Sequence, residues 1–123
     1  MTHIAPWLSV RDATEAVHFY RAAFGAVDSD RFEGDAGEVI VARLSIDAAD
    51  FWVQRDPGSS PDVVNEMSVR MILVVEEPDS VMARAVAAGA TEVYPVSEDH
   101  GWRIGRVEDP FGHHWEIGRQ ILG

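Results

Sequence analysis

The sequence predicts an α+β fold in which two βαβββ modules form a cupped mixed sheet with helices packed on its outer face. Three observations predict this fold: an internal repeat, a helix-like segment ended by a glycine in each copy, and strand-like runs after each helix. We expect the first module at about residues 1–57, a linker at 58–66 and the second module at about 67–123. A chain of 123 residues fits a single domain.

The first copy opens with a strand-like apolar stretch at residues 5–10 and continues into a predicted helix. Asp12 and Glu15 have the spacing of a capping box, in which side chains near the helix start satisfy its free N–H groups. Gly25 is expected to end the helix in a left-handed conformation. The buried stripe of this helix is predicted to contain Val17, Tyr20 and Phe24.

The second copy has matching signals for the start and the end of a helix. Its strand-like stretch covers residues 70–75, Pro78 suits the first position of a helix, and Gly89 is expected to close that helix. The predicted buried stripe of this second helix contains Val81, Met82, Ala85 and Val86.

Strand-like runs follow both helices, and turn-forming residues separate them. The predicted strands cover 27–32, 38–46 and 51–55 in the first copy, and 92–96, 102–107 and 113–117 in the second. The turn at residues 47–50 occupies the place of the turn at 109–112. Residues 56–62 are rich in Asp, Pro, Gly and Ser and are typical of a linker.

The composition excludes several classes of function. There is no cysteine, which excludes thiolate chemistry and suits a reducing compartment. All ten basic residues are arginine, which excludes lysine Schiff-base chemistry. A net charge of −11 disfavours nucleic acid as a partner, and no apolar run approaches the roughly 20 residues of a membrane span. Without a signal-peptide pattern at the N-terminus, we expect a cytoplasmic protein.

Several short motifs occur in an order that resembles a known superfamily. They are Val10-Arg11-Asp12, His18-Phe19-Tyr20, Phe24-Gly25, the segment 87–90 and the segment 109–117. In this order they resemble the vicinal oxygen chelate superfamily, which includes glyoxalase I, bleomycin-resistance proteins, extradiol dioxygenases and some epoxide-opening resistance enzymes. The resemblance covers nearly the whole chain. It implies the fold, and because one fold hosts many functions, the function has to be argued from the site.

The resemblance also implies where a metal would bind. Metal-dependent members hold a divalent cation on the concave sheet face with residues from the first and last strand of each module. The matching positions here are Ala5, Gln54, Arg70 and Glu116. Only Glu116 suits a divalent cation, because alanine has no donor atom and a guanidinium is positively charged. We therefore expect no metal and no cofactor, and either an Arg70–Glu116 ion pair or an arginine that faces an anionic group of the ligand.

Strand alternation places a set of candidate ligand-binding residues in the cup. The set contains Trp7, Trp52, Gln54, Arg70, His114 and Glu116, and Trp102 is a further candidate at the rim. For Trp7 and Trp52 three roles fit the sequence: stacking on a ligand, filling the core, or a contact in a dimer. Trp115 points to the other face and is expected in the core. Arg103 and Arg106 lie on opposite faces of one strand, so one of them is expected in the cup, and the sequence leaves open which.

His114 shares a strand face with Glu116, and its adjacent residue His113 faces the other way. His114 and Glu116 suit a base with its orienting partner or two metal ligands, and a purely structural histidine is the alternative.

The leading functional hypothesis is a metal-independent pocket that binds a small organic molecule, cationic or aromatic, and sequesters an antibiotic or metabolite as bleomycin-resistance proteins do. The main alternative is an enzyme: a metal-dependent lyase, isomerase or dioxygenase with a shifted ligand set that includes His114 and Glu116, or a metal-free acid–base catalyst. A third hypothesis is a stress or regulatory protein whose cup is a dimer interface. The resemblance implies a homodimer, with modules that pair within one chain or exchange between two.

Overall fold

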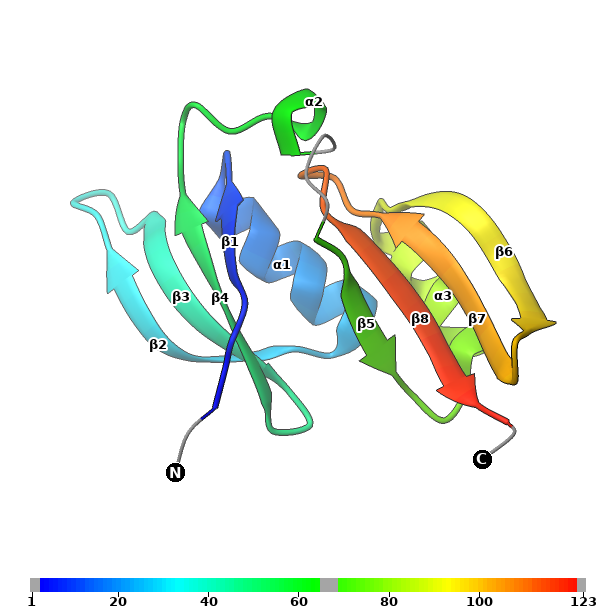
Figure 1. Cartoon of the computed structure of the whole chain (residues 1–123). Helices are drawn as coiled ribbons and strands as arrows, with labels where there is room; N and C mark the ends of the chain where they lie inside the picture. The colour runs from blue at the N-terminus through cyan, green and yellow to red at the C-terminus, as the bar shows by residue number, and fades with distance from the viewer. Residues whose placement is uncertain (1–2, 65–68, 122–123) are drawn as a thin grey trace. The chain divides into compact units, whose positions relative to one another are not determined.

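Each half of the chain builds one four-stranded mixed sheet with a helix on one face (Figure 1). The computed structural model describes residues 3–64 and 69–121, and it divides between Ser60 and Pro61 into two compact units. We call these unit 1 and unit 2. The predicted α+β fold class and its two βαβββ modules are confirmed, because both units contain a strand, a helix and three further strands in the same order and with the same strand order in the sheet; unit 2 has one additional short helix before them.

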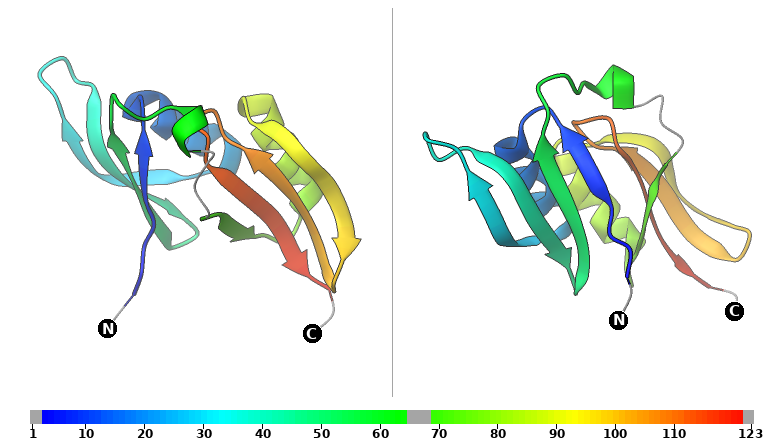
Figure 2. Two further views of the ribbon diagram at one scale, coloured as in Figure 1. Left: turned by 45° about the horizontal axis from the view of Figure 1, so that its top comes forward. Right: turned by 60° about the vertical axis from the view of Figure 1, so that its left-hand side comes forward.

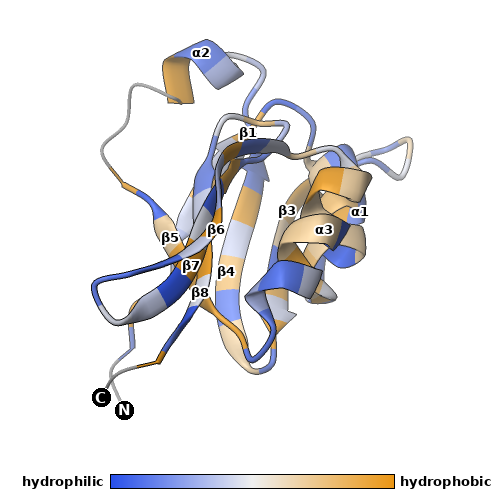
Figure 3. Ribbon diagram, turned by 90° about the vertical axis from the view of Figure 1, so that its right-hand side faces the viewer, coloured by the Kyte–Doolittle hydropathy of each residue, from blue (hydrophilic) through white to orange (hydrophobic). Residues whose placement is uncertain are grey.

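Unit 1 contains β1 (Trp7–Val10), α1 (Ala13–Phe24), β2 (Val27–Glu33), β3 (Val39–Ile46) and β4 (Ala49–Arg55). Its sheet has the order β1-β4-β3-β2, in which β1 is parallel to β4 and the other pairs are antiparallel. Helix α1 packs on β3 and β4 (Figure 2). Hydrophobic and hydrophilic residues alternate along β4, as Figure 3 shows, so one face of the strand packs on the helix and the other does not.

The ends of α1 follow the sequence prediction. The Asp12 side chain accepts a hydrogen bond from the backbone N–H of Glu15 at 3.0 Å, and Gly25 ends the helix with φ 70°. The buried face includes Val17, Tyr20 and Phe24, as expected.

Unit 2 contains α2 (Pro61–Val64), β5 (Met71–Val74), α3 (Pro78–Ala88), β6 (Thr91–Asp99), β7 (Trp102–Glu108) and β8 (His114–Gln120). Its sheet has the order β5-β8-β7-β6, and α3 packs on β6, β7 and β8. No helix in the described part of the chain is long and apolar enough to cross a membrane.

The short helix α2 was not expected from the sequence. Its segment overlaps the predicted linker at 58–66, the last part of which lies outside the described residues. Pro61 suits the first helical position, and this residue lies against Gly112 in the turn between β7 and β8. A Cβ atom on Gly112 would come within 2.6 Å of the Pro61 Cα atom. The glycine therefore permits this close approach.

Helix α3 begins at Pro78 as predicted, but its buried stripe is narrower than expected. Met82 and Ala85 are buried with Pro78, whereas Val86 is 43% exposed. The prediction that Val86 is buried was wrong because Val86 lies about 80° around the helix from Pro78, at the margin of the stripe.

The two turns that occupy equivalent places have different geometry. Residues Asp47 and Ala48 form a two-residue turn with φ 48° and 70°, which is the left-handed backbone of a tight hairpin. In the other turn, Asp109 is only 2% exposed. Its carboxylate accepts hydrogen bonds from the backbone N–H groups of Phe111 and His113 at 3.0 and 2.9 Å.

The same carboxylate also accepts a hydrogen bond from the indole N–H of Trp115 at 2.9 Å. Trp115 is buried, as the sequence predicted. The Asp109 carboxylate thus joins the turn to the core of unit 2 and fixes the beginning of β8.

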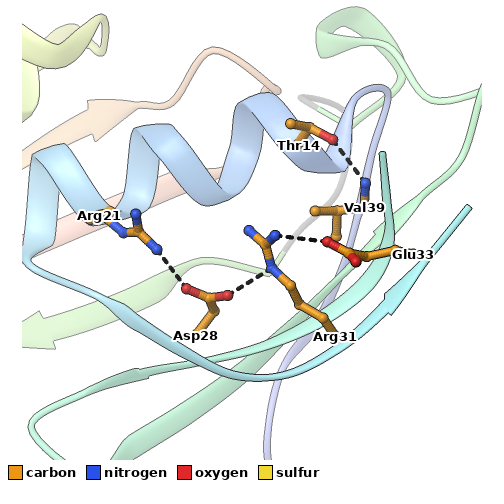
Figure 4. Close-up of polar contacts among 6 residues, drawn as sticks. All are labelled: Thr14, Arg21, Asp28, Arg31, Glu33 and Val39. Carbon is orange, nitrogen blue, oxygen red and sulfur yellow. Dashed lines mark hydrogen bonds and ion pairs between the residues drawn. The ribbon is translucent and has the colours of Figure 1, made fainter. Parts of the chain in front are cut away.

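A second carboxylate holds β2 to α1 in unit 1 (Figure 4). Asp28 contacts the guanidinium of Arg21 at 2.6 Å and that of Arg31 at 2.7 Å, and Arg31 also contacts Glu33 at 3.0 Å. Burial of the Asp28 carboxyl by itself raises its pKa. The hydrogen bonds and charges of the two arginines outweigh this effect, so the pKa of Asp28 lies below its usual value.

Asp28→Asn is expected to lower the free energy of unfolding by about 1 kcal/mol at pH 7. Because the folded-state pKa of Asp28 is depressed, this stabilisation is present above its unfolded pKa of about 4 and disappears as the pH falls through the folded-state pKa. Urea denaturation of both proteins between pH 7 and pH 2 checks the prediction. The control is Asp30→Asn, an exposed carboxyl on the same strand, and a pH-independent difference for Asp28→Asn would contradict the prediction.

Asp109→Asn is expected to cost about 3 kcal/mol of stability, because the amide presents an NH₂ donor to N–H groups that need a buried acceptor. Its equivalent in unit 1 supplies the control. Asp47→Asn should change the stability little, because asparagine tolerates the left-handed backbone found there. The measurement is urea denaturation at pH 7, and similar effects of the two substitutions would show that the buried carboxylate is not needed.

Candidate functional site

The candidate site residues lie on the side of each sheet opposite its helix, which we call the far face. Along β1, Leu8 and Val10 are buried against the helix side, while Trp7 is 52% exposed on the far face. The same alternation along β8 buries Trp115 and Ile117 on the helix side. The expected grouping of side chains by strand face is thus present in each unit.

The far face of unit 1 carries a row of side chains from four adjacent strands. Trp7 pairs with Trp52 across β1 and β4, and their rings stack with centroids 5.7 Å apart and planes 23° apart. On the other side of Trp52, the Arg43 guanidinium lies over its ring at 5.7 Å. Arg43 in turn contacts Asp30 at 2.9 Å. The row therefore runs from two aromatic rings to a cation and then to a carboxylate.

Gln54 holds the exposed end of this row. Its side-chain oxygen accepts a hydrogen bond from the indole N–H of Trp7 at 2.8 Å. Because Trp7 is held by this bond and by its stacking on Trp52, its exposed ring is oriented by the protein. The Trp7–Trp52 pair, which we call the aromatic shelf, presents flat apolar surface suited to stacking.

The far face of unit 2 has a different chemistry. The ion pair expected between Arg70 and Glu116 is present, with Arg70 Nε 3.2 Å from the carboxylate. Arg106 contacts the same carboxylate from β7 at 3.7 Å. The guanidinium of Arg106 also lies 5.2 Å from the centroid of the Tyr94 ring. Two cations thus share one carboxylate.

The structure answers which arginine of β7 reaches the far face. Arg103 points to the helix side, where its guanidinium binds the Asp79 carboxylate of α3 with contacts of 2.8–3.1 Å. Arg106 lies on the far face, in register with Glu116. Alternation predicts that the two arginines lie on opposite faces of the strand, but it does not predict which of them lies on the helix side.

His114 and Trp102 occupy different parts of the far face of unit 2. His114 lies on the same face as Glu116, and its Nε2 atom is 3.9 Å from the Glu108 carboxylate. Trp102 begins β7, four residues before Arg106, which corresponds to about 13 Å along a strand. The structure therefore brings His114 near the charged cluster and leaves Trp102 apart from it.

Sequence reasoning missed Arg43 and Tyr94. Arg43 follows the continuous apolar run 39–42, which gives no phase for alternation. Tyr94 lies between two irregularities in the pairing of β6 with β7, which also change the phase. No signal in the sequence alone could have placed either residue.

The residues at the four positions that the resemblance assigns to a metal do not suit a divalent cation. The Gln54 oxygen already accepts a bond from Trp7, and the Glu116 carboxylate is contacted by the guanidiniums of Arg70 and Arg106. Ala5 provides no donor. Within residues 3–64 and 69–121, no group of three or more His, Cys, Asp or Glu side chains is arranged to hold a metal ion.

A cavity of about 580 Å³ lies elsewhere in unit 1, near the start of α1. Its lining includes Arg11, Arg55 and Glu38, and none of the predicted site residues. Three carboxylates and two guanidiniums surround the cavity, so one negative charge is in excess, but groups of both signs line it and do not define a single ligand class.

Proteins similar to this chain occur in bacteria and plants. An uncharacterized protein of Mycobacterium bovis is 36% identical over 127 residues, an alignment that covers 96% of this chain and 83% of the relative. An uncharacterized protein of Arabidopsis thaliana is 30% identical, covering 82% of this chain and 68% of the relative.

Solved structures show the same fold. TioX from Micromonospora superimposes with a TM-score of 0.77 at 26% identity, covering 98% of this chain and 100% of that one. The fosfomycin resistance protein FosX from Listeria monocytogenes, in complex with Mn(II) and a dihydroxypropylphosphonic acid, gives a TM-score of 0.76 at 17% identity. This alignment covers 99% of this chain and 93% of FosX, and at that identity it bears on the fold alone.

The family assignment rests on nearly the whole sequence. The glyoxalase-like domain family matches residues 7–118, which include all eight strands of the described structure except the end of β8. This match and the structural neighbours confirm the resemblance to the vicinal oxygen chelate superfamily. The chain belongs to the glyoxalase-like domain family.

Proposed function

We propose that this protein binds a small organic molecule without the divalent metal that the resemblance implies, and that an aromatic part of the molecule stacks on the aromatic shelf. The observation that carries the proposal is the half-exposed Trp7 ring, stacked on Trp52 and held by Gln54. An oriented tryptophan pair of this kind supplies much contact area at little entropic cost.

The charges beside the aromatic shelf favour a neutral aromatic group over a cationic one. Arg43 already lies over the Trp52 ring, so a cation stacked there would meet a like charge. The negative net charge of the chain still favours cations in its surroundings, so both classes belong in a binding test. Sequestration of an antibiotic or a metabolite fits binding of this kind without turnover.

The alternative is an enzyme, and one observation favours it. The far face of unit 2 holds an imidazole and two carboxylates, from His114, Glu108 and Glu116, on two paired strands. Such a set suits acid–base chemistry. A lyase, isomerase or dioxygenase with a shifted metal site would need these groups to move closer together, because no three of the described His, Asp and Glu side chains are arranged to hold a metal ion. We prefer binding alone because the Glu116 carboxylate is occupied by two guanidiniums.

The proposal includes a cytoplasmic location, a homodimer and a single domain made of both units. The absence of cysteine suits a reducing compartment. The homodimer follows from the family resemblance, and the modest length of each unit supports a shared domain.

Binding is tested by titrating the protein with 2-naphthol, a neutral aromatic probe, and proflavine, a cationic one, while the indole N–H signals are followed by NMR. Saturable binding is expected, with the largest shift at Trp7. Trp52→Ala should weaken it about fivefold or more, because one stacking partner is lost. Trp102→Ala is the control, since Trp102 is not part of the aromatic shelf.

Two results would contradict the proposal: no saturable binding of either probe, or equal binding by Trp52→Ala and the unaltered protein. Trp52→Phe keeps an aromatic ring and should retain most of the affinity. This variant covers the case in which Trp52→Ala does not fold.

Metal independence is tested by elemental analysis of protein purified without chelators. We expect much less than one zinc, nickel, manganese or iron per chain, and no rise in the melting temperature when these ions are added. A metal bound at a hundred times its Kd would add about 2.7 kcal/mol of stability, which a melting curve detects easily. Stoichiometric metal that is lost in Glu116→Ala and kept in the control Glu98→Ala would favour the enzyme.

A further inference from the structure

We infer that the far face of unit 2 carries an oxyanion site centred on Arg106, so that the molecule bound there is an organic carboxylate or phosphate. This inference rests on the proposed function, because it names the chemical class of the ligand. It goes beyond that function by assigning the role to a residue that the family pattern does not single out.

The first observation is the contrast between the two arginines of β7. Arg103 binds Asp79 through Nε and one terminal nitrogen, which is the forked geometry that guanidinium and carboxylate groups prefer. Among the described residues, the one ion pair of Arg106 is its contact with Glu116 at 3.7 Å, which is longer than a hydrogen bond. One strand therefore carries a satisfied and an unsatisfied guanidinium on opposite faces.

The second observation is the Nε atom of Arg106. It is buried and has no hydrogen-bond acceptor within residues 3–64 and 69–121. A buried donor of a charged group that lacks an acceptor costs free energy, so native structures rarely keep one without a reason. Because the Nε atom has almost no accessible surface, an oxyanion binds the terminal nitrogens of this guanidinium, whose side chain is 22% exposed as a whole.

The third observation concerns the groups around Arg106. The Tyr94 ring lies against the guanidinium at 5.2 Å and restricts its orientation. Arg70 lies on the other side of Glu116, and its side chain is 47% exposed. Two guanidiniums around one carboxylate leave one positive charge. The Glu108 carboxylate, on the same face of β7 as Arg106, offsets this charge over the face as a whole and lies 3.9 Å from the imidazole of His114.

Apolar residues on the same face favour an organic anion over an inorganic one. Ile72 is in register with Glu116, and Val74 follows it on the same face of β5. Their side chains are about as exposed as that of Tyr94, at 60% and 62%. Covering these surfaces gives a ligand with an apolar part additional affinity.

The experiment follows the Arg106 Nε–H signal of ¹⁵N-labelled protein by NMR during titration with butyrate at constant ionic strength. The signal should move and saturate, with a dissociation constant in the millimolar range for so small a probe. Butyramide, the neutral analogue of the same shape, should leave it unmoved. Acetate should bind more weakly than butyrate, because it lacks the apolar chain.

Inorganic phosphate forms a second arm that distinguishes the two sources of an oxyanion. Stronger binding of phosphate than of acetate indicates a phosphate ester as the natural ligand, and the reverse indicates a carboxylate. Either result supports the oxyanion site.

Arg106→Gln should weaken butyrate binding about tenfold or more, since a charge-assisted hydrogen bond is lost. Arg103→Gln on the opposite face is the matched control and should bind butyrate normally. Arg106→Lys keeps the positive charge but loses the paired N–H donors of the guanidinium, so this variant should bind butyrate with intermediate affinity. This variant keeps the inference testable if Arg106→Gln does not fold.

An Arg106 signal that moves equally with butyrate and butyramide, or normal butyrate binding by Arg106→Gln, would overturn the inference. The proposed function can fail separately. Binding of 2-naphthol that depends on Trp52, without any effect of butyrate, removes only the oxyanion site. Butyrate binding without binding of either aromatic probe removes only the aromatic shelf.

Discussion

The carboxylate of Glu116 lies between two guanidinium groups, and this arrangement determines what the far face of unit 2 can bind. Arg70 reaches it from one side at 3.2 Å and Arg106 from the other at 3.7 Å. A carboxylate already shared by two guanidiniums is a poor ligand for a third cation. The position that the resemblance assigns to a metal is thus the place where we infer an oxyanion, and exposed apolar residues of β5 lie on the same face.

The two units of the internal repeat have the same sheet geometry but different side chains on their far faces. Both sheets have the same strand order, and in both the far face carries an arginine from the third strand of the unit's sheet, Arg43 in β3 and Arg106 in β7. In unit 1 this arginine lies over Trp52 and is paired with Asp30. In unit 2 it lies over the Tyr94 ring and makes a long contact with Glu116. The aromatic shelf thus offers stacking, whereas the cluster of unit 2 offers charge.

The sequence was sufficient for the fold because its local signals agree with one another. Asp12 and Gly25 mark the ends of α1, and Pro78 marks the beginning of α3. The Arg70–Glu116 pair was expected from the resemblance to the superfamily, which assigns both positions to one site. Other features depend on information that local signals lack. The helix α2 depends on the contact of its first residue with Gly112.

The sequence also did not predict which face of the sheet each side chain on the inner strands points to. A continuous apolar run before Arg43 gives no alternation, and irregular pairing around Tyr94 shifts it. These two residues complete the far faces of units 1 and 2. On the inner strands the sequence named Trp102 and the pair Arg103 and Arg106 of β7, without the face of the two arginines, and it named no residue of β2, β3 or β6. On β8, where the faces of the side chains were predicted correctly, the buried carboxylate of Asp109 fixes the position of the strand. By binding the turn and Trp115, it sets the register of β8, and a slip of one residue would turn Glu116 toward α3.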